Sequence, residues 1–364
     1  MRAYIDIENL RSFIASRENE QYKDCYEDCF RLLQRQLSIV WNFTTDSFFK
    51  DEETRKKYKE TLDFLHGFSP TNRGWSEDKD TYSPKLFPAR PIKSNAANQF
   101  KDIEDHSAIF LINDEKTILF KEKGLYLVGQ LGEELNTIKR LFCGKDYDFN
   151  HLYNIHDSCS FPNWEQLEKD KLTLPLSDII IMDRYIGSQE ELMEYNLFKI
   201  IEVLVKNVKG EVNLVLFCNK TNSFKDKDTG KTVTKTPEWN TILDNIFNLL
   251  KEKTGFTGNV TIVFFPKEDK KNNDKPKNAD HDRIIFTNYM MYTSGDSFCY
   301  YNSKGEMISS GIKLDVYSLA KKSNYDFARS FLLQAQMILE KVKELNNEDM
   351  ILGKGKAKSN YLKF

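Results

Sequence analysis

Apolar and polar positions alternate along the chain with two periods, and together they predict an α/β fold. In the first half, short apolar runs typical of buried strands occur at residues 3–10, 37–43, 108–115 and 125–129. Between the first two runs, apolar positions recur every three or four residues through about Arg35, which predicts an amphipathic helix. Strands that alternate with helices are typical of a parallel sheet covered by helices. We therefore expect an α/β domain over residues 1–150.

The same alternation resumes after a connecting region at residues 144–171. Apolar runs predict strands at residues 178–183, 212–217 and 260–265, with helices up to about residue 207 and from Trp239 to about Lys253. Thr236 and Pro237 suit the start of this last helix, because threonine can cap a helix and proline fits its first turn. The charged segment 219–236 is expected to form an exposed hairpin or loop around Gly230.

A long amphipathic segment closes the second half of the chain. Apolar residues follow helical spacing at Phe327, Phe331, Leu332, Ala335 and Ile338. They predict a packed helix over residues 325–345. The residues after it include Lys354, Lys356 and Lys358. We therefore expect a second α/β domain at residues 172–345 and a basic tail at residues 346–364.

The composition is that of a folded protein without a strong charge bias. The 364 residues exceed what one hydrophobic core usually organises, which favours two domains. With 53 Lys and Arg against 55 Asp and Glu, a polyanion would have to bind a local basic patch. The sequence shows neither a signal peptide nor a membrane-length apolar run, so we expect a cytoplasmic protein. Six cysteines without a CxxC pair predict reduced thiols.

The most informative motif follows a lysine-rich loop in the second domain. Four residues separate Arg283 from Asn288 and six separate Asn288 from Gly295, with His281 before them and Ser297 after them. A neutral imidazole can attack phosphorus or transfer a proton to a leaving oxygen. A cation two positions along a strand lies on the same face as the histidine and can neutralise phosphate oxygens. These residue types at this spacing predict a phosphate-handling site.

The spacing resembles the motif of the phospholipase-D superfamily, in which histidine, lysine, aspartate, glycine and serine stand at these intervals. Here Arg283 stands at the lysine position and Asn288 at the aspartate position, and Asp296 stands where the motif has serine. With Asp183-Arg184-Tyr185 upstream, the sequence is most similar to the phospholipase-D-like domain at the C-terminus of MIT-domain proteins. Those domains carry H-D-R and bind phospholipid head groups. The resemblance covers about residues 172–300.

This resemblance implies a phosphodiesterase-type site that needs no cofactor. It implies catalytic roles for His281, Arg283 and Asn288, and phosphate binding by Ser297, Asp183 and Tyr185. Members of the superfamily build one active site from two copies of the motif, so catalysis by this chain would require a homodimer. Because arginine and asparagine differ chemically from lysine and aspartate, ligand binding is expected to survive better than turnover.

A second candidate site lies at the start of the chain. Asp6-Ile7-Glu8-Asn9 follows a predicted strand and resembles the opening of NYN and PIN-type nucleases, in which carboxylates at strand ends hold a divalent metal. Asp114 and Glu115 end another predicted strand, so Asp6, Asp114 and Glu115 are candidate ligands for Mg²⁺ or Mn²⁺. The alternative is that these acids cap the helices that follow. The first domain is thus expected to be Rossmann-like or PIN-like.

Together, these patterns predict that the second domain binds a phosphate-containing ligand, with nucleic acid preferred. The resemblance favours a phosphodiesterase or nuclease in prokaryotic antiviral defence. The alternatives are a non-enzymatic module for lipid head groups, nucleic acid or protein, and a scaffold within a larger protein assembly. The lysine-rich loops at residues 219–236 and 267–277 suit a polyanion, whereas their interspersed acidic residues suit a solvated surface equally well.

Overall fold

The computed structural model describes the chain in segments. These comprise residues 2–5, 7–21, 23, 26–27, 30, 38–41, 51–68, 108–111, 126–128, 153–154, 164, 176–187, 189–208, 210–225, 230, 232–266, 283–308, 313–319 and 322–355. The chain divides into two compact units, residues 1–148 with 318–326 and residues 149–317 with 327–364. Among the segments just given, no helix is both long enough and apolar enough to cross a membrane.

The first unit contains a small parallel sheet, as the apolar runs predicted. Its strands, in spatial order, are β2 (Ser38–Trp41), β1 (Arg2–Ile5), β3 (Ala108–Leu111) and β4 (Tyr126–Val128), and each neighbouring pair is parallel. The helices described in full are α1 (Ile7–Ala15), α3 (Glu52–Lys57) and α4 (Lys59–Phe68), with a 3₁₀ turn at Ser16–Glu18. The buried Phe13 ring stacks on Tyr26 with 4.7 Å between centroids and meets Phe64 edge-on. This aromatic cluster ties α1 to α4.

The second unit is built on one mixed sheet. Its strands, in chain order, are β5 (Tyr153–Asn154), β6 (Asp178–Met182), β7 (Asn213–Cys218), β10 (Asn259–Phe264), β11 (Arg283–Phe286), β12 (Met290–Ser294), β13 (Lys313–Ser318) and β14 (Ile351–Lys354). In space the order is β14-β10-β7-β6-β11-β12-β13-β5, so seven strands come from residues 178–354 and the two-residue β5 joins one edge. The three central strands β6, β7 and β10 are parallel, whereas β11 and β14 pair with them antiparallel.

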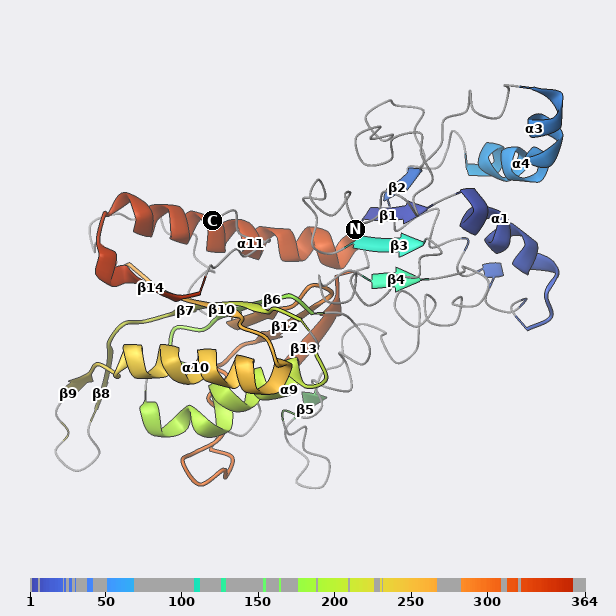
Figure 1. Ribbon diagram of the computed structural model, residues 1–364. Coiled ribbons are helices and arrows are strands. Elements are labelled where there is room, and N and C mark those ends of the chain that lie inside the picture. The colour runs from blue at the N-terminus through green and yellow to red at the C-terminus, as the bar shows by residue number, and fades with distance from the viewer. Residues whose placement is uncertain are drawn as a thin grey trace. The chain divides into compact units, whose positions relative to one another are not determined.

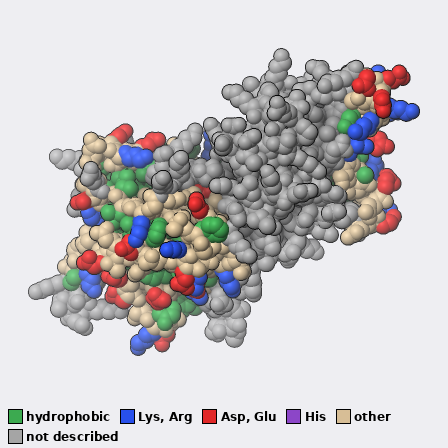
Figure 2. Space-filling view, viewed as in Figure 1, with side chains coloured by type: hydrophobic (Ala, Val, Ile, Leu, Met, Phe, Trp, Pro, Cys, Tyr) green, Lys and Arg blue, Asp and Glu red, His purple; other side chains and the backbone are tan. Residues whose placement is uncertain are grey.

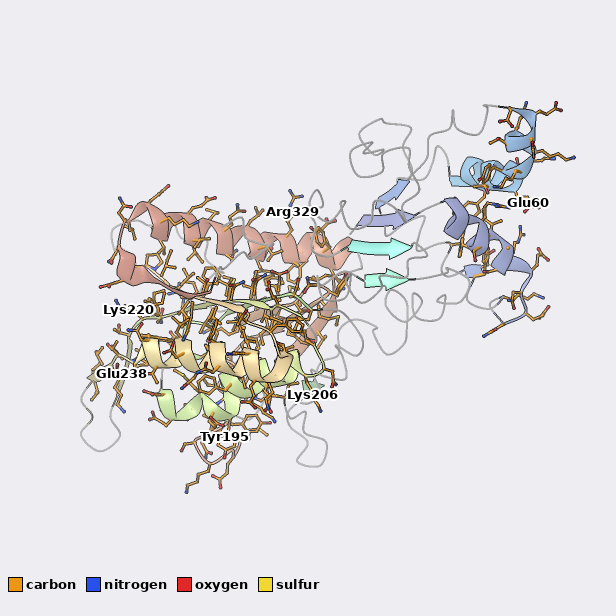
Figure 3. All side chains as sticks on the ribbon, viewed as in Figure 1. Glu60, Tyr195, Lys206, Lys220, Glu238 and Arg329 are labelled. Carbon is orange, nitrogen blue, oxygen red and sulfur yellow. The ribbon has the colours of Figure 1, made fainter. Side chains whose placement is uncertain are left out.

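Helices cover both faces of this sheet (Figure 1). A π-helical turn (Glu194–Phe198) leads into α9 (Lys199–Val205), and together with α10 (Trp239–Thr254) it lies along one face. The long α11 (Lys322–Glu344) lies along the other face. Figure 3 shows side chains filling the space between these layers. Cover on both faces explains why every residue of β6 is buried and apolar runs mark the strands so clearly.

The helix boundaries follow ordinary capping rules with one departure from expectation. α10 begins after Glu238, whose side chain makes no capping hydrogen bond, so the prediction that Thr236 caps it is wrong. Its end is conventional, because Gly255 adopts the left-handed conformation (φ +77°) and its N–H donates to the Lys251 carbonyl at 3.0 Å. A short 3₁₀ turn (Glu190–Leu192) precedes the π-helical turn.

Part of the predicted basic tail belongs to the sheet. After α11, a 3₁₀ turn (Glu348–Met350) leads into β14, which pairs antiparallel with β10. The Lys354 ammonium forms an ion pair of 2.6 Å with Asp244 of α10 and lies 4.8 Å from the centroid of the Phe247 ring. Residues 351–354 are therefore an edge strand.

The segment after β7 forms a hairpin, one of the two structures predicted for residues 219–236. Strands β8 (Asn222–Lys225) and β9 (Thr232–Lys235) pair antiparallel, and Ser223 and Thr234 share a hydroxyl hydrogen bond of 2.8 Å. Acidic and basic side chains are interspersed over the visible face of the second unit (Figure 2). The described surface in this view therefore offers no broad field of one sign.

Gly187 provides a test of the packing between the sheet and α10. A Cβ atom at this position would overlap the Trp239 ring, which is buried and donates its indole N–H to the Lys220 carbonyl at 2.8 Å. We expect Gly187→Ala to lower the free energy of unfolding by about 1–3 kcal/mol, because a packed core cannot accept the added methyl group. The matched control is Gly295→Ala, since a Cβ there meets no atom within 4 Å. Equal stability of the two variants in urea unfolding would contradict this packing.

Candidate functional site

Asp183 is the centre of a polar cluster at the carboxyl end of β6. Its backbone N–H donates to the Phe217 carbonyl at 3.0 Å, which fixes the end of the β6–β7 ladder. Its carboxylate accepts hydrogen bonds from the Tyr185 N–H at 2.9 Å, the Ser297 hydroxyl at 2.8 Å and the Phe298 N–H at 2.7 Å. One carboxylate therefore joins the end of β6 to its own turn and to the loop after β12.

Arg283 brings a positive charge to the same place. It begins β11, whose antiparallel register sets Ile284 opposite Met182 and so places Arg283 beside Asp183. The Arg283 Nε lies 3.7 Å from the Asp183 Oδ1, and the two side chains are 8% and 0% exposed. The guanidinium carbon also lies 5.5 Å from the centroid of the Tyr185 ring. The charge of Asp183 is thus balanced by a nearly buried arginine under an exposed aromatic ring.

The electrostatics of this cluster are dominated by burial. Desolvation raises the pKa of the Asp183 carboxyl above its usual value, although its three hydrogen bonds and the Arg283 charge act in the opposite direction. Burial also raises the pKa of the Cys218 thiol well above its usual value and that of Cys299 to about 12. Both thiols therefore remain protonated, and neither has the character of a cysteine nucleophile.

Two more cations lie at the carboxyl ends of β6 and β7. Arg184 follows Asp183, and its guanidinium carbon lies 4.6 Å from the centroid of the Phe265 ring. The Arg184 carbonyl accepts a hydrogen bond of 3.1 Å from the Asn219 N–H, which places Lys220 next along the same edge. The Lys220 ammonium lies 3.7 Å from the Asp349 carboxylate. Sequence analysis named neither cation as a site residue, because only the β6–β7 pairing brings them together.

Four of the predicted phosphate-site residues therefore converge: Asp183, Tyr185, Arg283 and Ser297. We call this set the β6 edge. Ser297 contributes through its hydroxyl, which donates to Asp183, and the Tyr185 ring is 46% exposed at the surface. His281 lies outside the described residues, two positions before Arg283.

Asn288 lies at the other end of the same strand pair. β11 runs antiparallel to β6, and Asn288 lies five positions after Arg283, a separation of roughly 16 Å if the chain between them is extended. The buried Asn288 Oδ1 accepts hydrogen bonds from the Ser177 N–H at 2.8 Å and the Asp178 N–H at 3.1 Å. Its Nδ2 donates to the Ser177 hydroxyl at 3.0 Å and to Asp178 Oδ2 at 3.4 Å. These contacts hold the start of β6 to the turn between β11 and β12.

The predicted metal ligands Asp6, Asp114 and Glu115 lie outside the described residues. The strands that precede them, β1 and β3, are parallel neighbours with Ile5 opposite Leu111, an arrangement that the metal hypothesis requires. Within the part of the chain that the structure describes, no group of three or more His, Cys, Asp or Glu side chains is arranged to hold a metal ion.

No protein-family model matches the sequence, and no curated protein matches it.

The contacts of Asn288 predict the outcome of restoring the aspartate of the superfamily motif. Asn288→Asp removes the Nδ2 donor and sets a second carboxylate beside the buried Asp178. We expect this substitution to lower the free energy of unfolding by about 2–4 kcal/mol, because it replaces a hydrogen-bond donor with a second buried carboxylate beside Asp178. The matched control is Asn248→Asp on the exposed side of α10, which should change stability by less than about 0.5 kcal/mol. Urea unfolding in which Asn288→Asp is as stable as the wild type would contradict this role.

Proposed function

We propose that the second unit binds phosphate-containing ligands at the β6 edge and that nucleic acid is the preferred ligand. The observation that carries the proposal is the position of Arg283, held by Asp183 beneath the exposed Tyr185 ring. Arginine matches phosphate oxygens through its planar fork of N–H donors, and a neighbouring carboxylate fixes the orientation of that fork. An exposed tyrosine beside a phosphate site can stack on a base.

The neighbouring groups support the same ligand class. Arg184 is a second cation at the carboxyl end of β6, and Lys220, which pairs with Asp349, lies at the carboxyl end of β7. Ligands of α/β sheets commonly bind at the carboxyl ends of the parallel strands, and this edge is such a place. Because acidic side chains are interspersed over the surface in Figure 2, the attraction for phosphate would be local. The decrease in affinity with added salt should therefore reflect only the few cations at this edge.

For the chemistry of the site we propose an impaired phosphodiesterase of the phospholipase-D type. In this mechanism the His281 imidazole of one copy attacks phosphorus, and the leaving oxygen takes a proton from the His281 imidazolium of a second copy. Water then gives a proton back to that second imidazole and hydrolyses the histidine–phosphorus bond. The route needs a second histidine, and therefore a homodimer. Arg283 in place of lysine and Asn288 in place of aspartate favour binding over turnover. Prokaryotic antiviral defence is the biological setting that we propose for such a module.

A metal-dependent nuclease site at Asp6, Asp114 and Glu115, holding Mg²⁺ or Mn²⁺, is the second route to cleavage. The parallel pairing of β1 with β3 favours it. Only this route is abolished by EDTA.

A non-enzymatic role is favoured by one feature of Asp183. Its two oxygens already accept three hydrogen bonds within the chain and face Arg283, so its function can be to hold a fixed binding surface. Such a surface would suit lipid head groups, another protein or a scaffold within a larger assembly. Vesicles containing anionic phospholipids, tested beside nucleic acid, distinguish the first of these from the proposed ligand.

Fluorescence anisotropy with labelled single- and double-stranded DNA and RNA tests the binding proposal. We expect Tyr185→Ala to weaken the binding of single strands about tenfold, because the loss of one base-stacking platform is worth about 1–3 kcal/mol. The control is Phe256→Ala, another exposed aromatic residue, beyond the end of α10, which should leave affinity unchanged. Failure of every nucleic acid to bind at micromolar concentration, or equal affinities of the two variants, would refute the proposed ligand.

The same samples test catalysis. Cleavage that persists in EDTA and disappears in His281→Ala would support the phospholipase-D route, whereas cleavage that requires Mg²⁺ or Mn²⁺ would support the N-terminal acids. If the protein binds nucleic acid but cleaves none under any of these conditions, the result would support the non-enzymatic role.

A further inference from the structure

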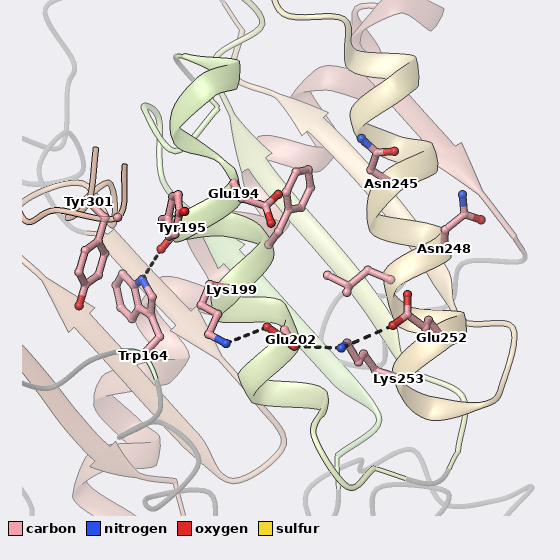
Figure 4. A pocket seen from close by; sticks show the side chains of 13 residues that line it. Trp164, Glu194, Tyr195, Lys199, Glu202, Asn245, Asn248, Glu252, Lys253 and Tyr301 are labelled. Carbon is pink, nitrogen blue, oxygen red and sulfur yellow. Dashed lines mark hydrogen bonds and ion pairs between the residues drawn. The ribbon is translucent and has the colours of Figure 1, made fainter. Parts of the chain in front are cut away.

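A groove runs between α9 and α10 on the side away from the sheet (Figure 4). Its volume is about 680 Å³, within the range of ligand pockets. One end is aromatic, with Trp164, Tyr195 and Tyr301, and α10 supplies amide side chains at the other. The groove is separate from the β6 edge, because none of its lining residues belongs to that set.

The aromatic end is held in place by buried contacts. Asn196, fully buried in the π-helical turn, donates to the Tyr301 carbonyl at 2.8 Å and accepts from the Tyr301 N–H at 3.0 Å. The Trp164 indole donates to the Tyr195 carbonyl at 2.9 Å. Tyr195 packs on Gly305, where a Cβ atom would come within 2.8 Å of its ring. The Tyr195 ring is nevertheless 41% exposed, and it lies on the outer side of the helical layer (Figure 3).

The groove is lined by one more acidic side chain than basic side chains. Glu202 pairs with Lys199 and with Lys253, each at 2.9 Å, and Lys253 also lies 3.5 Å from Glu252. The groove is thus lined by three carboxylates, Glu194, Glu202 and Glu252, and by two ammonium groups. Glu194 forms no ion pair with any residue that the structure describes. The described lining residues carry one net negative charge, which disfavours phosphate and favours a basic occupant.

The α10 side of the groove offers hydrogen-bonding groups that suit a peptide. Asn245 and Asn248 stand three residues apart on one helical face and are exposed in the groove (Figure 4). Among the described residues, neither side chain has a hydrogen-bond partner. Amide side chains both donate and accept, so they can pair with the N–H and C=O groups of an extended backbone.

Residues 356–364 have the chemistry that this groove requires. Their sequence, Lys-Ala-Lys-Ser-Asn-Tyr-Leu-Lys-Phe, contains three lysines, two aromatic residues and no acidic residue. These residues follow Gly355 directly. Gly355 lies against Gly258 and Asn259, just beyond the end of α10. Glu252 and Lys253, on the last turn of α10, line the groove. Nine extended residues span about 30 Å, which is enough to pass the end of α10 and follow the groove.

We propose that residues 356–364 dock in the groove between α9 and α10 of the same chain. The lysines face Glu194 and Glu252, and an aromatic side chain of the segment lies against Tyr195 and Tyr301. A tether this short gives an effective concentration on the order of millimolar, so a site of sub-millimolar affinity is mostly filled. The docked segment would extend the edge strand β14 across α10 and cover the exposed Tyr195 ring.

Hydroxyl-radical footprinting of the full chain tests the proposal, with Tyr185 as an internal reference because its exposure, 46%, is close to the 41% of Tyr195. In the wild type, Tyr195 should be oxidised at least about threefold more slowly than Tyr185, in line with a mostly filled site. In the triple variant Lys356→Glu, Lys358→Glu and Lys363→Glu, the two rates should become similar. The matched control reverses three exposed lysines elsewhere, Lys56, Lys59 and Lys341, and should leave the protection intact.

A second variant separates docking from a general loss of structure. Introduced alone, Glu194→Gln should remove the protection of Tyr195. Introduced into the triple variant, it should not change the oxidation rate of Tyr195 further, because both changes break the same contact. Protection that is absent in the wild type, or that survives the triple charge reversal, would overturn the proposal. Protection that falls on dilution would also overturn it, because the occupant would then be a second copy of the chain.

Discussion

The arrangement of the second unit depends on how one buried carboxylate is satisfied. Asp183 carries its charge into the interior, where desolvation is costly, and the chain offsets that cost with two backbone N–H groups, one hydroxyl and an arginine. These donors come from the turn after β6, the start of β11 and the loop after β12. Removing Asp183 would take away the carboxylate that joins the end of β6 to these three segments and that lies 3.7 Å from the Arg283 Nε.

Polar side chains anchor the β6–β11 pair at both ends. Asp183 and Arg283 hold the carboxyl end of β6, and Asn288 holds its start through Ser177 and Asp178. Between these anchors, β6 and β11 are apolar and fully buried. These polar contacts at both ends fix the register of the short strand pair, because a shift of one residue would break both sets of contacts. Such rigidity would suit the phosphate site that we propose, because it fixes the position of Arg283.

The sequence predicted the elements that local patterns control and missed those that depend on distant pairing. The strands β6, β7 and β10 and the helix α10 follow from apolar runs and helical spacing, and the structure confirms them. The prediction of a basic tail at residues 346–364 is wrong for β14, because its four residues include a glycine and a lysine and its apolar pair alone does not predict a strand. In the same way, the motif spacing predicts one site for Arg283 and Asn288, whereas Arg283 begins β11 and Asn288 lies in the turn after it. Arg184 and Lys220 were missed because strand pairing, and no sequence motif, makes them neighbours.

The central claim, that burial governs Asp183, is tested most directly by the pH dependence of stability in the wild type and Asp183→Asn. A raised folded-state pKa means that the native chain binds more protons than the unfolded chain between the usual pKa of 3.8 and the raised value. The free energy of unfolding of the wild type, relative to the variant, should therefore decrease as the pH rises through that window from about 4. Urea unfolding between pH 4 and 8 measures this difference. A difference that increases with pH would mean that hydrogen bonds and Arg283 outweigh desolvation, and it would contradict the account.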